Sequence, residues 1–272
     1  MLPDPAEDAV QALFLLVKDE RALSENPRYQ AWVISWGEET DRNHVVGAEF
    51  LQAHNETDLF SLFLEKVREI DPDMIVGFET QKNSLGYLIE RYRHLLTLNL
   101  CQDLSRIQTP GGKEGFLNED HEGWEFRHSS GIHITGRVVL NVWRILKSDI
   151  TLTTYTYENF VYHILHQRVP HYTFEMLTEF YTNPALRQRW RVFAHYLDRA
   201  RKSIDMLDKL EVVDQASEFA RVFGTDFYSV LTRGSQYKVE SVMLRVSRAH
   251  NFVALSPGPQ QVRVLGWVCV CV

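Results

Sequence analysis

The sequence predicts an α/β fold, and two observations support that prediction. Along the first half of the chain, short apolar runs of strand length alternate with segments whose apolar residues follow helical spacing. A helix of this kind must bury its apolar stripe against a neighbouring layer, which is typical of α/β proteins. The composition agrees, since 44% of the 272 residues are hydrophobic and 24% are charged, and this excludes disordered and fibrous classes.

The first elements are two strands and a helix. Residues 10–17 and 31–36 are apolar runs that we expect to pair as buried strands. Thr57 or Asp58 is expected to cap a helix that ends at Asp71-Pro72. The apolar positions of this helix follow helical spacing and are Leu59, Phe60, Phe63, Leu64 and Val67.

The middle of the chain predicts further strands around a long loop. Residues 74–78 are expected to form a third buried strand, and Asn83 or Ser84 is expected to cap a second helix. Residues 102–130 are polar and rich in glycine, so we expect a long surface loop there. Residues 132–146 are expected to form one extended strand that is apolar on both faces at its centre.

Two helices are expected beyond this strand. The first has Glu158 in its first turn. The second is long, and its outer face carries two favourable i,i+4 pairs, Asp198 with Lys202 and Asp205 with Lys209. Its apolar residues repeat at alternating threes and fours and are Trp190, Phe193, Leu197, Ala200, Ile204 and Leu207.

Charge, cysteines and hydropathy narrow the function classes. The balance of 29 Lys+Arg against 36 Asp+Glu gives −7, so nucleic acid or an anionic membrane could be bound only through a local basic patch. Cys101, Cys269 and Cys271 match no disulfide, zinc or iron–sulfur pattern. The N-terminal residues do not resemble a signal peptide, and no apolar run reaches the roughly 20 residues of a membrane span. We therefore expect a soluble intracellular protein with no membrane partner.

Two other patterns are weighed as ligand sites. His163, His166 and His171 cluster in the sequence, but no cysteine or carboxylate completes a tetrahedral metal set, so we interpret them as core or surface histidines. Residues 111–113 (GGK) lack the remaining positions of a P-loop and are interpreted as a turn.

Several segments, taken in order and with their spacing, resemble the exonuclease region of family B DNA polymerases. They are residues 71–78 (DPDMIVGF), 136–141 (GRVVLN) and 232–241 (TRGSQYKVES). Further runs resemble the catalytic subunit of a translesion member of that family, and these are residues 81–88 (QKNSLGYL), 141–145 (NVWRI), 165–168 (LHQR) and 239–245 (VESVMLR). The resemblance covers residues 3–256.

The resemblance implies an RNase H-like (DnaQ-like 3′→5′ exonuclease) fold, with a mixed sheet flanked by helices. It implies an exonuclease-like domain over residues 1–222, a connection toward the polymerase palm over 223–256, and a divergent apolar tail over 257–272. The first strand of such a fold, with its Asp-x-Glu motif, is expected upstream of Leu2. A missing strand and an apolar tail predict an aggregation-prone chain. The tail is interpreted as a read-through product or as a splice end.

The resemblance also identifies the positions that matter for chemistry. In this family, carboxylates hold two metal ions that promote phosphodiester hydrolysis. Ser84 lies at one of the acidic positions, and Arg199 lies at another, or Ala200 if the register is taken from Tyr196; Asn141 lies where relatives can carry Asp. An arginine there places a permanent positive charge where a metal must bind. We therefore expect no catalytic residue, metal or cofactor in this chain, whereas the whole polymerase would use Mg²⁺ and an iron–sulfur cluster.

The resemblance places a local basic segment near a DNA primer-template. Its residues are Arg233, Gln236, Tyr237, Lys238 and Arg245. The expected partners are therefore the primer-template and the other subunits of the translesion polymerase complex, and the expected location is the nucleus. In this interpretation the chain is a catalytically inactive scaffold and nucleic-acid-binding region used in replication past lesions and in DNA repair.

Two alternatives from other function classes stay open. One is a divergent metal-dependent 3′→5′ exonuclease that uses Glu79, Asp198 and a third acid. The other is a stand-alone module that binds a protein or a primer-template.

Overall fold

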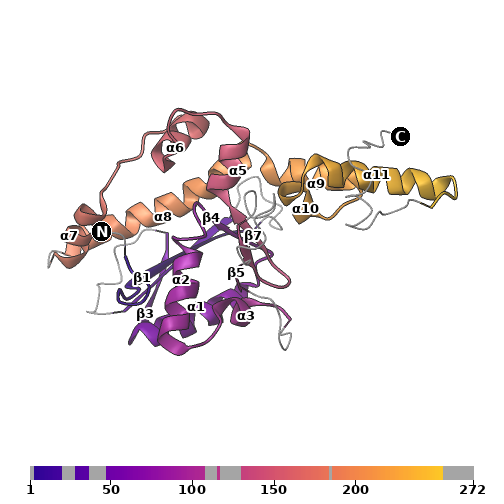
Figure 1. Ribbon diagram of the computed structural model, residues 1–272. Coiled ribbons are helices and arrows are strands. Elements are labelled where there is room, and N and C mark those ends of the chain that lie inside the picture. The colour runs from indigo at the N-terminus through magenta and orange to yellow at the C-terminus, as the bar shows by residue number, and fades with distance from the viewer. Residues whose placement is uncertain are drawn as a thin grey trace. The chain divides into compact units, whose positions relative to one another are not determined.

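The chain divides into two compact units, Met1–Gln215 and Ala216–Val272, which are described separately below. Figure 1 shows the computed structural model with its elements labelled. The residues that the structure describes are 3–19, 28–36, 47–107, 115–116, 130–183 and 186–253.

A mixed three-stranded sheet forms the centre of the first unit. Strand β1 (Ala12–Asp19) runs antiparallel to β2 (Arg28–Trp36), with Leu16 opposite Ala31. Strand β3 (Glu49–Ala53) runs parallel to β2 on its other side. The predicted pairing of the two apolar runs is confirmed, and so is the α/β class with a mixed sheet.

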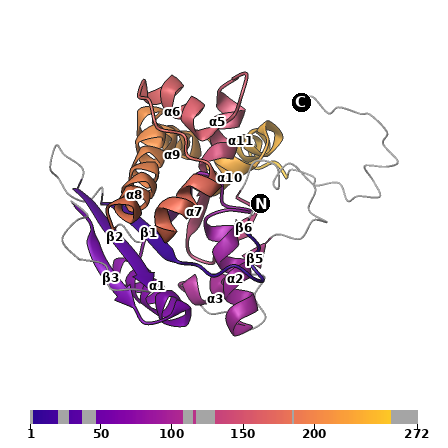
Figure 2. The same ribbon diagram turned by 90° about the vertical axis from the view of Figure 1, so that its left-hand side faces the viewer.

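Helices cover both faces of this sheet. Helix α1 (Glu56–Ile70) contacts β2 and β3, whereas the long helix α8 (Leu186–Lys209) contacts β1 (Figure 2). On the α8 side, Val33 lies in a cluster with Trp190 and Phe193. On the α1 side, the core includes the predicted apolar stripe of Leu59, Phe60, Phe63, Leu64 and Val67.

The ends of α1 show how local hydrogen bonding positions a helix. Asn55 is the N-cap, and its side chain accepts a hydrogen bond from the main-chain N–H of Asp58. The prediction of Thr57 or Asp58 as the cap was therefore wrong. Asn55 lies three residues before the N–H that its side chain binds, whereas Thr57 and Asp58 already lie inside the first turn of the helix. Asp71 ends the helix in the left-handed conformation, as its place before Pro72 predicted.

A second, two-stranded sheet lies in the same unit. Strand β4 (Met74–Gly77) pairs in parallel with β7 (Val138–Asn141), and Gly77 is opposite Asn141. The predicted third strand is confirmed. Helix α2 (Leu85–Leu96) follows β4 and buries Leu85, Ile89 and Tyr92 in the core shared with α1.

Residues 132–146 do not form one strand, contrary to the prediction. They contain β6 (Ile132–His133), a turn at Gly136 with φ 83°, β7, and the start of helix α5 (Val142–Asp149). The strand ends at Asn141 because its side chain caps α5, accepting from the main-chain N–H of Arg144 at 3.2 Å. From there the apolar residues Val142, Ile145 and Leu146 follow helical spacing and are buried.

The predicted loop over residues 102–130 is also only partly a loop. Its start belongs to helix α3 (Leu100–Leu104), which Asn99 caps through an acceptor bond from the N–H of Cys101. Leu104 is buried with Leu100 and Cys101, so an apolar i,i+4 pair outweighs the polar neighbours. Within the loop, β5 (Gly115–Phe116) pairs with β6. Residues 108–114, including the GGK segment, and 117–129 lie outside the described residues.

Charged residues of two of the motifs described above, residues 71–78 and 136–141, join β4 to β7 near the amino ends of these strands. Asp71 Oδ1 is 2.9 Å from Nη2 of Arg137 and 2.8 Å from Nε of Arg106. The Arg137 side chain is only 3% exposed and also donates to the carbonyls of Leu104 and Pro72. Burial lowers the pKa of Arg137, and the carboxylate of Asp71 counteracts that shift. These motif residues therefore hold the two strands in register.

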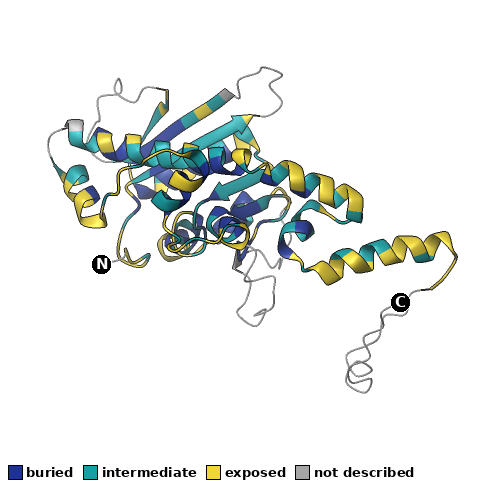
Figure 3. Ribbon diagram, turned by 90° about the horizontal axis from the view of Figure 1, so that it is seen from above, coloured by how far each residue is buried: buried dark blue, intermediate teal, exposed yellow. Residues whose placement is uncertain are grey.

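The remaining helices extend the first unit and build the second. Helices α6 (Tyr157–Leu165) and α7 (Phe174–Thr182) precede α8, and the expected helix with Glu158 in its first turn is confirmed as α6. Helix α9 (Val212–Phe223) crosses the boundary into the second unit, which contains α10 (Phe227–Thr232) and α11 (Ser235–Ala249). Helix α11 has no buried residue, and Figure 3 colours most of it as exposed. In the described part of the chain, none of the helices is long and apolar enough to span a membrane.

Candidate functional site

The candidate site lies where β4 and β7 end. The carboxyl ends of parallel strands meet at one edge of a sheet, which is where α/β proteins commonly place functional side chains. Because Gly77 pairs with Asn141, the loop of residues 78–84 that follows β4 begins beside the end of β7. Glu79, Ser84 and Asn141 are therefore brought to the same edge.

Glu79 organises this loop through its carboxylate. It accepts hydrogen bonds from the main-chain N–H groups of Gln81 at 3.0 Å and of Lys82 and Asn83 at 3.1 Å. The amide Nδ2 of Asn141 lies 3.5 Å from Glu79 Oε1. Both carboxylate oxygens therefore accept hydrogen bonds from the main chain of the loop that leads into α2.

Ser84 precedes α2 but does not cap it with its side chain. Its backbone is at φ 53° and ψ −122°, and the hydroxyl makes no capping hydrogen bond. Our interpretation of Ser84 as a side-chain cap was wrong, because its backbone is not in the extended conformation of an N-cap and the N–H of Gly86 donates instead to the Asn83 carbonyl at 3.2 Å. The loop also folds back tightly: a Cβ on Gly86 would lie 1.9 Å from the Gln81 carbonyl oxygen, so only glycine fits there.

Asn141 is 2% exposed and both ends of its amide have partners. Its Oδ1 accepts from the N–H of Arg144, while Nδ2 faces Glu79. Arg144 in turn donates from Nη2 to Oε1 of Gln81 at 2.5 Å. Burial lowers the pKa of this arginine, and the charge of Glu79 opposes the shift. The edge of the second sheet is therefore a hydrogen-bonded network of loop, amide and guanidinium.

Arg199 on α8 lies close to the same edge. Its guanidinium carbon is 3.9 Å from the ring centroid of Tyr157 and 5.7 Å from that of Phe78, the residue that follows β4. Its Nη1 lies 3.7 Å from Oε1 of Glu158. The Tyr157 hydroxyl donates to the Arg199 carbonyl at 2.9 Å, which ties α6 to α8. A cation that stacks on the Tyr157 ring and pairs with one acid thus occupies this position.

The neighbours of Arg199 are also engaged. Asp198 pairs with Lys202, which confirms that predicted i,i+4 pair. Asp205 instead accepts from the hydroxyl of Tyr29 at 2.8 Å, and burial followed by this bond raises the pKa of Tyr29 to about 12. Burial and the charge of Arg199 lower the pKa of His195, which favours its neutral form.

The predicted histidine cluster does not form a ligand set. His171 Nδ1 lies 3.2 Å from Oε1 of Glu158, whereas His163 and His166 are exposed on α6 and at its C-terminal end. Among the residues that the structure describes, no group of three or more His, Cys, Asp or Glu side chains could hold a metal ion.

The predicted basic segment lies in the second unit. The Arg233 guanidinium is 5.9 Å from the ring centroid of Tyr237, and Gln236 Nε2 donates to Glu240 at 2.9 Å. Arg245 is turned back onto its own unit, where it donates to the carbonyl of Val222 and lies against Gly224. Lys238 is half-buried. The structure thus brings Arg233 and Tyr237 together, while Arg245 supports the contact of α11 with α9.

Residues 2–159, more than half of the chain, match the family described as DNA polymerase family B, exonuclease domain. The chain belongs to this family. It is 36% identical over 260 residues to the human DNA polymerase zeta catalytic subunit, and the match covers 96% of this chain and 8% of that protein. For the polymerase zeta catalytic subunit of Saccharomyces cerevisiae the identity is 34% over 271 residues, covering 96% of this chain and 18% of the relative.

A DNA polymerase delta relative is similar over a shorter stretch. The DNA polymerase delta catalytic subunit of Caenorhabditis elegans is 29% identical over 210 residues, covering 76% of this chain and 19% of that protein. The chain is therefore homologous to the exonuclease-domain region of polymerase zeta catalytic subunits, as the sequence motifs indicated. It spans less than a fifth of the length of each of these relatives.

Sequence reasoning missed the structural roles of two site residues, Glu79 and Arg199. The partners of Glu79 follow directly in the chain, and an acid before a polar, helix-leading loop could have indicated that role. The pairing of Arg199 with Glu158 and the stacking on Tyr157 join different helices, and no local pattern signals such contacts.

Proposed function

We propose that this chain is a non-hydrolytic, RNase H-like exonuclease domain of a polymerase zeta catalytic subunit, serving as a scaffold in translesion synthesis and DNA repair in the nucleus. The observation that carries the proposal is Arg199, whose guanidinium stacks on Tyr157 and pairs with Glu158 at a position where the family places a metal-binding acid. The DNA primer-template and the other subunits of the polymerase zeta complex are the proposed partners.

The side chains at the edge of the second sheet do not fit the Mg²⁺ ions that the family implies. Hydrolysis by two divalent ions needs several anionic ligands, because the ions repel each other strongly at about 4 Å. Here Ser84 and Asn141 are neutral, and Arg199 is positive at any physiological pH. We therefore derive no metal-dependent step at this site. The Mg²⁺ and the iron–sulfur cluster expected of the whole polymerase belong, in this proposal, to regions other than this chain.

The exonuclease alternative requires acids that the structure engages elsewhere. Glu79 accepts three main-chain N–H groups, and Asp198 pairs with Lys202. Moving Glu79 onto a metal would break three hydrogen bonds that each contribute about 0.5–1.5 kcal/mol, and moving Asp198 would break an ion pair. These contacts support a structural role for both acids.

The first test measures hydrolysis directly. We expect the purified chain to release no nucleotides from single-stranded DNA with either Mg²⁺ or Mn²⁺, because its candidate site lacks the anionic ligands. A matched pair of variants makes the test specific: Glu79→Ala at the site, and Glu65→Ala at an exposed position of α1. Metal-dependent cleavage that Glu79→Ala abolishes and Glu65→Ala retains would contradict the proposal and establish the exonuclease alternative.

The second test concerns DNA binding by the second unit. We expect weak binding of a primer-template that Arg233→Glu with Lys238→Glu reduces, lowering the slope of log affinity against log salt by about 2, or about 1 per lost phosphate contact. Arg93→Glu with Arg168→Glu makes the same charge change at exposed positions of the first unit and should leave the slope nearly unchanged. Equal effects of the two double variants would assign the binding to net charge alone.

A further inference from the structure

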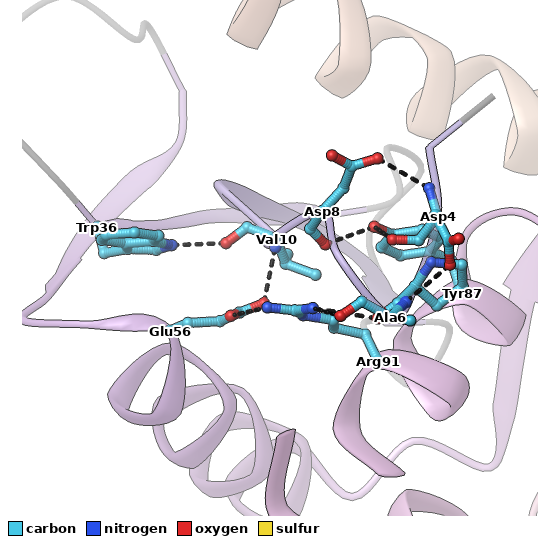
Figure 4. Close-up of polar contacts among 9 residues, drawn as sticks. Asp4, Ala6, Asp8, Val10, Trp36, Glu56, Tyr87 and Arg91 are labelled. Atoms are coloured by element: carbon cyan, nitrogen blue, oxygen red, sulfur yellow. Dashed lines mark hydrogen bonds and ion pairs between the residues drawn. The ribbon is translucent and has the colours of Figure 1, made fainter. Parts of the chain in front are cut away.

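The residues before β1 are held to the rest of the first unit by hydrogen bonds of their main chain and, at Val10, by a side chain buried in the core. Arg91 Nη1 donates to the carbonyls of Pro5 and Ala6, both at 3.1 Å, and the Tyr87 hydroxyl donates to the carbonyl of Asp8 at 2.7 Å (Figure 4). The N–H of Val10 donates to Glu56 Oε1 at 2.7 Å. Residues 4–10, called the N-terminal segment below, are thus bound by side chains of α1 and α2.

The acidic side chains of the N-terminal segment bond within it. Asp8 accepts from the N–H of Asp4 at 2.8 Å, and Asp4 accepts from the N–H of Ala6 at 2.9 Å. The N–H of Asp8 donates to the carbonyl of Asp4, which closes one turn of chain. The acids therefore shape the turn, and its carbonyl groups are left pointing at the guanidinium of Arg91.

The side chains that receive this segment hold one another in place. Arg91 binds both oxygens of Glu56, Nε to Oε1 at 2.9 Å and Nη2 to Oε2 at 2.8 Å, and both residues are buried. This bidentate ion pair fixes the guanidinium so that Nη1 of Arg91 points at the N-terminal segment. The binding groups are therefore positioned by the domain itself, so little ordering is needed when a peptide binds to them.

The segment itself buries little apolar surface. Of residues 4–10, Val10 is buried, Pro5 and Ala9 are half-buried, and the others are exposed. Elements held by hydrogen bonds with few buried apolar contacts open at lower free energy than the core. Val10, the last residue of the segment, makes a second hydrogen bond, since Trp36 Nε1 donates to its carbonyl at 2.6 Å (Figure 4).

We propose that Glu56, Tyr87 and Arg91 form a main-chain binding site for a turn of acidic peptide, and that the N-terminal segment is its detachable occupant. The site recognises carbonyl groups and one N–H rather than particular side chains. It releases the segment without unfolding of the domain, and once open it takes up a peptide of the same sequence from another molecule.

Opening is tested first in the whole chain by hydrogen exchange. We expect the amides of Ala6, Asp8 and Val10 to exchange at least about tenfold faster than those of buried α1 residues, which exchange by global unfolding. Val10→Pro removes the N–H that binds Glu56, whereas Val10→Ala keeps it and removes only methyl groups. Faster exchange of the Ala6 and Asp8 amides in Val10→Pro than in Val10→Ala, with α1 protection unchanged, is the expected result. Segment amides that exchange only together with α1 would overturn the proposal.

Uptake in trans is tested with a synthetic peptide of residues 3–11, acetylated and amidated at its ends. We expect it to bind the whole Val10→Pro chain and to bind the wild-type chain at least about tenfold more weakly, because the wild-type segment competes at high effective concentration. A peptide with N-methylated Val10 should bind less tightly. Equal binding of the unmodified peptide to Val10→Pro with or without Arg91→Lys would overturn the proposal, as would no binding to Val10→Pro. A wild-type dimer that Arg91→Lys disperses would support exchange between copies.

Discussion

We expect the Arg137→Met variant to lose about 2 to 5 kcal/mol of the free energy of unfolding, measured by urea denaturation, because two main-chain carbonyls lose a donor at about 1–3 kcal/mol each. The Arg137 side chain is 3% exposed and donates to the carbonyls of Leu104 and Pro72 as well as to Asp71. Without it, both carbonyls lose a charged donor at the junction of α3, β4 and β7.

Arg106 provides the matched control for this prediction. It also pairs with Asp71 and Asp73 and donates to the carbonyls of Asp71 and Gly136, but its side chain is 31% exposed and water can replace much of what it contributes. We expect Arg106→Met to lose only about 1 kcal/mol, in the range of exposed ion pairs. Equal losses in the two variants would show that the burial of Arg137 adds nothing to the stability that its contacts provide.

The second large effect is expected at the buried pair of Glu56 and Arg91. Glu56→Leu should lose about 3 to 5 kcal/mol, because Arg91 then stays buried without its carboxylate and the N–H of Val10 loses its acceptor. The double variant Glu56→Leu with Arg91→Met should recover part of this loss, since an apolar pair removes the buried charge. Strictly additive losses in a double-mutant cycle would contradict a direct interaction between the two side chains.

The same pair predicts a dependence of stability on pH. Burial alone raises the pKa of Glu56, but hydrogen bonds from Arg91 and Val10 and the charge of Arg91 outweigh burial and hold the pKa below its ordinary value. A carboxyl with a lowered pKa in the folded state contributes stability above the unfolded value of about 4.3, and this is lost as the pH falls through the folded value. The Tm of the wild type should therefore fall more steeply below about pH 4 than that of the Glu56→Leu, Arg91→Met variant.

The motifs that identify the family have a structural explanation in this chain. Asp71 and Arg137 belong to the two recognised segments before and within the second sheet, and they join β4 to β7 through ion pairs and main-chain contacts. The side chains at the edge where those strands end include the amide of Asn141, the hydroxyl of Ser84 and the carboxylate of Glu79. The residues that keep the strand register therefore lie at the opposite ends of the two strands from the candidate site.

Local sequence patterns were sufficient for several elements and for the family. The apolar runs that became β1 and β2, and the stripe that became the core face of α8, were readable because burial of one face imposes a period on the chain. The residue types at positions 84, 141 and 199 are also known from the sequence alone, and the proposal of a non-hydrolytic site rests on them.

Competition between neighbouring groups decided what the sequence could not. The side chain of Asn141 caps α5 and so ends the expected long strand, and the N–H of Gly86 in the first turn of α2 donates to the Asn83 carbonyl rather than to the Ser84 hydroxyl. The stacking of Arg199 on Tyr157 and the bonds of Arg91 to the N-terminal segment join residues far apart in the chain. Such contacts exist only once the core has packed their helices together, so the tertiary structure alone determined them.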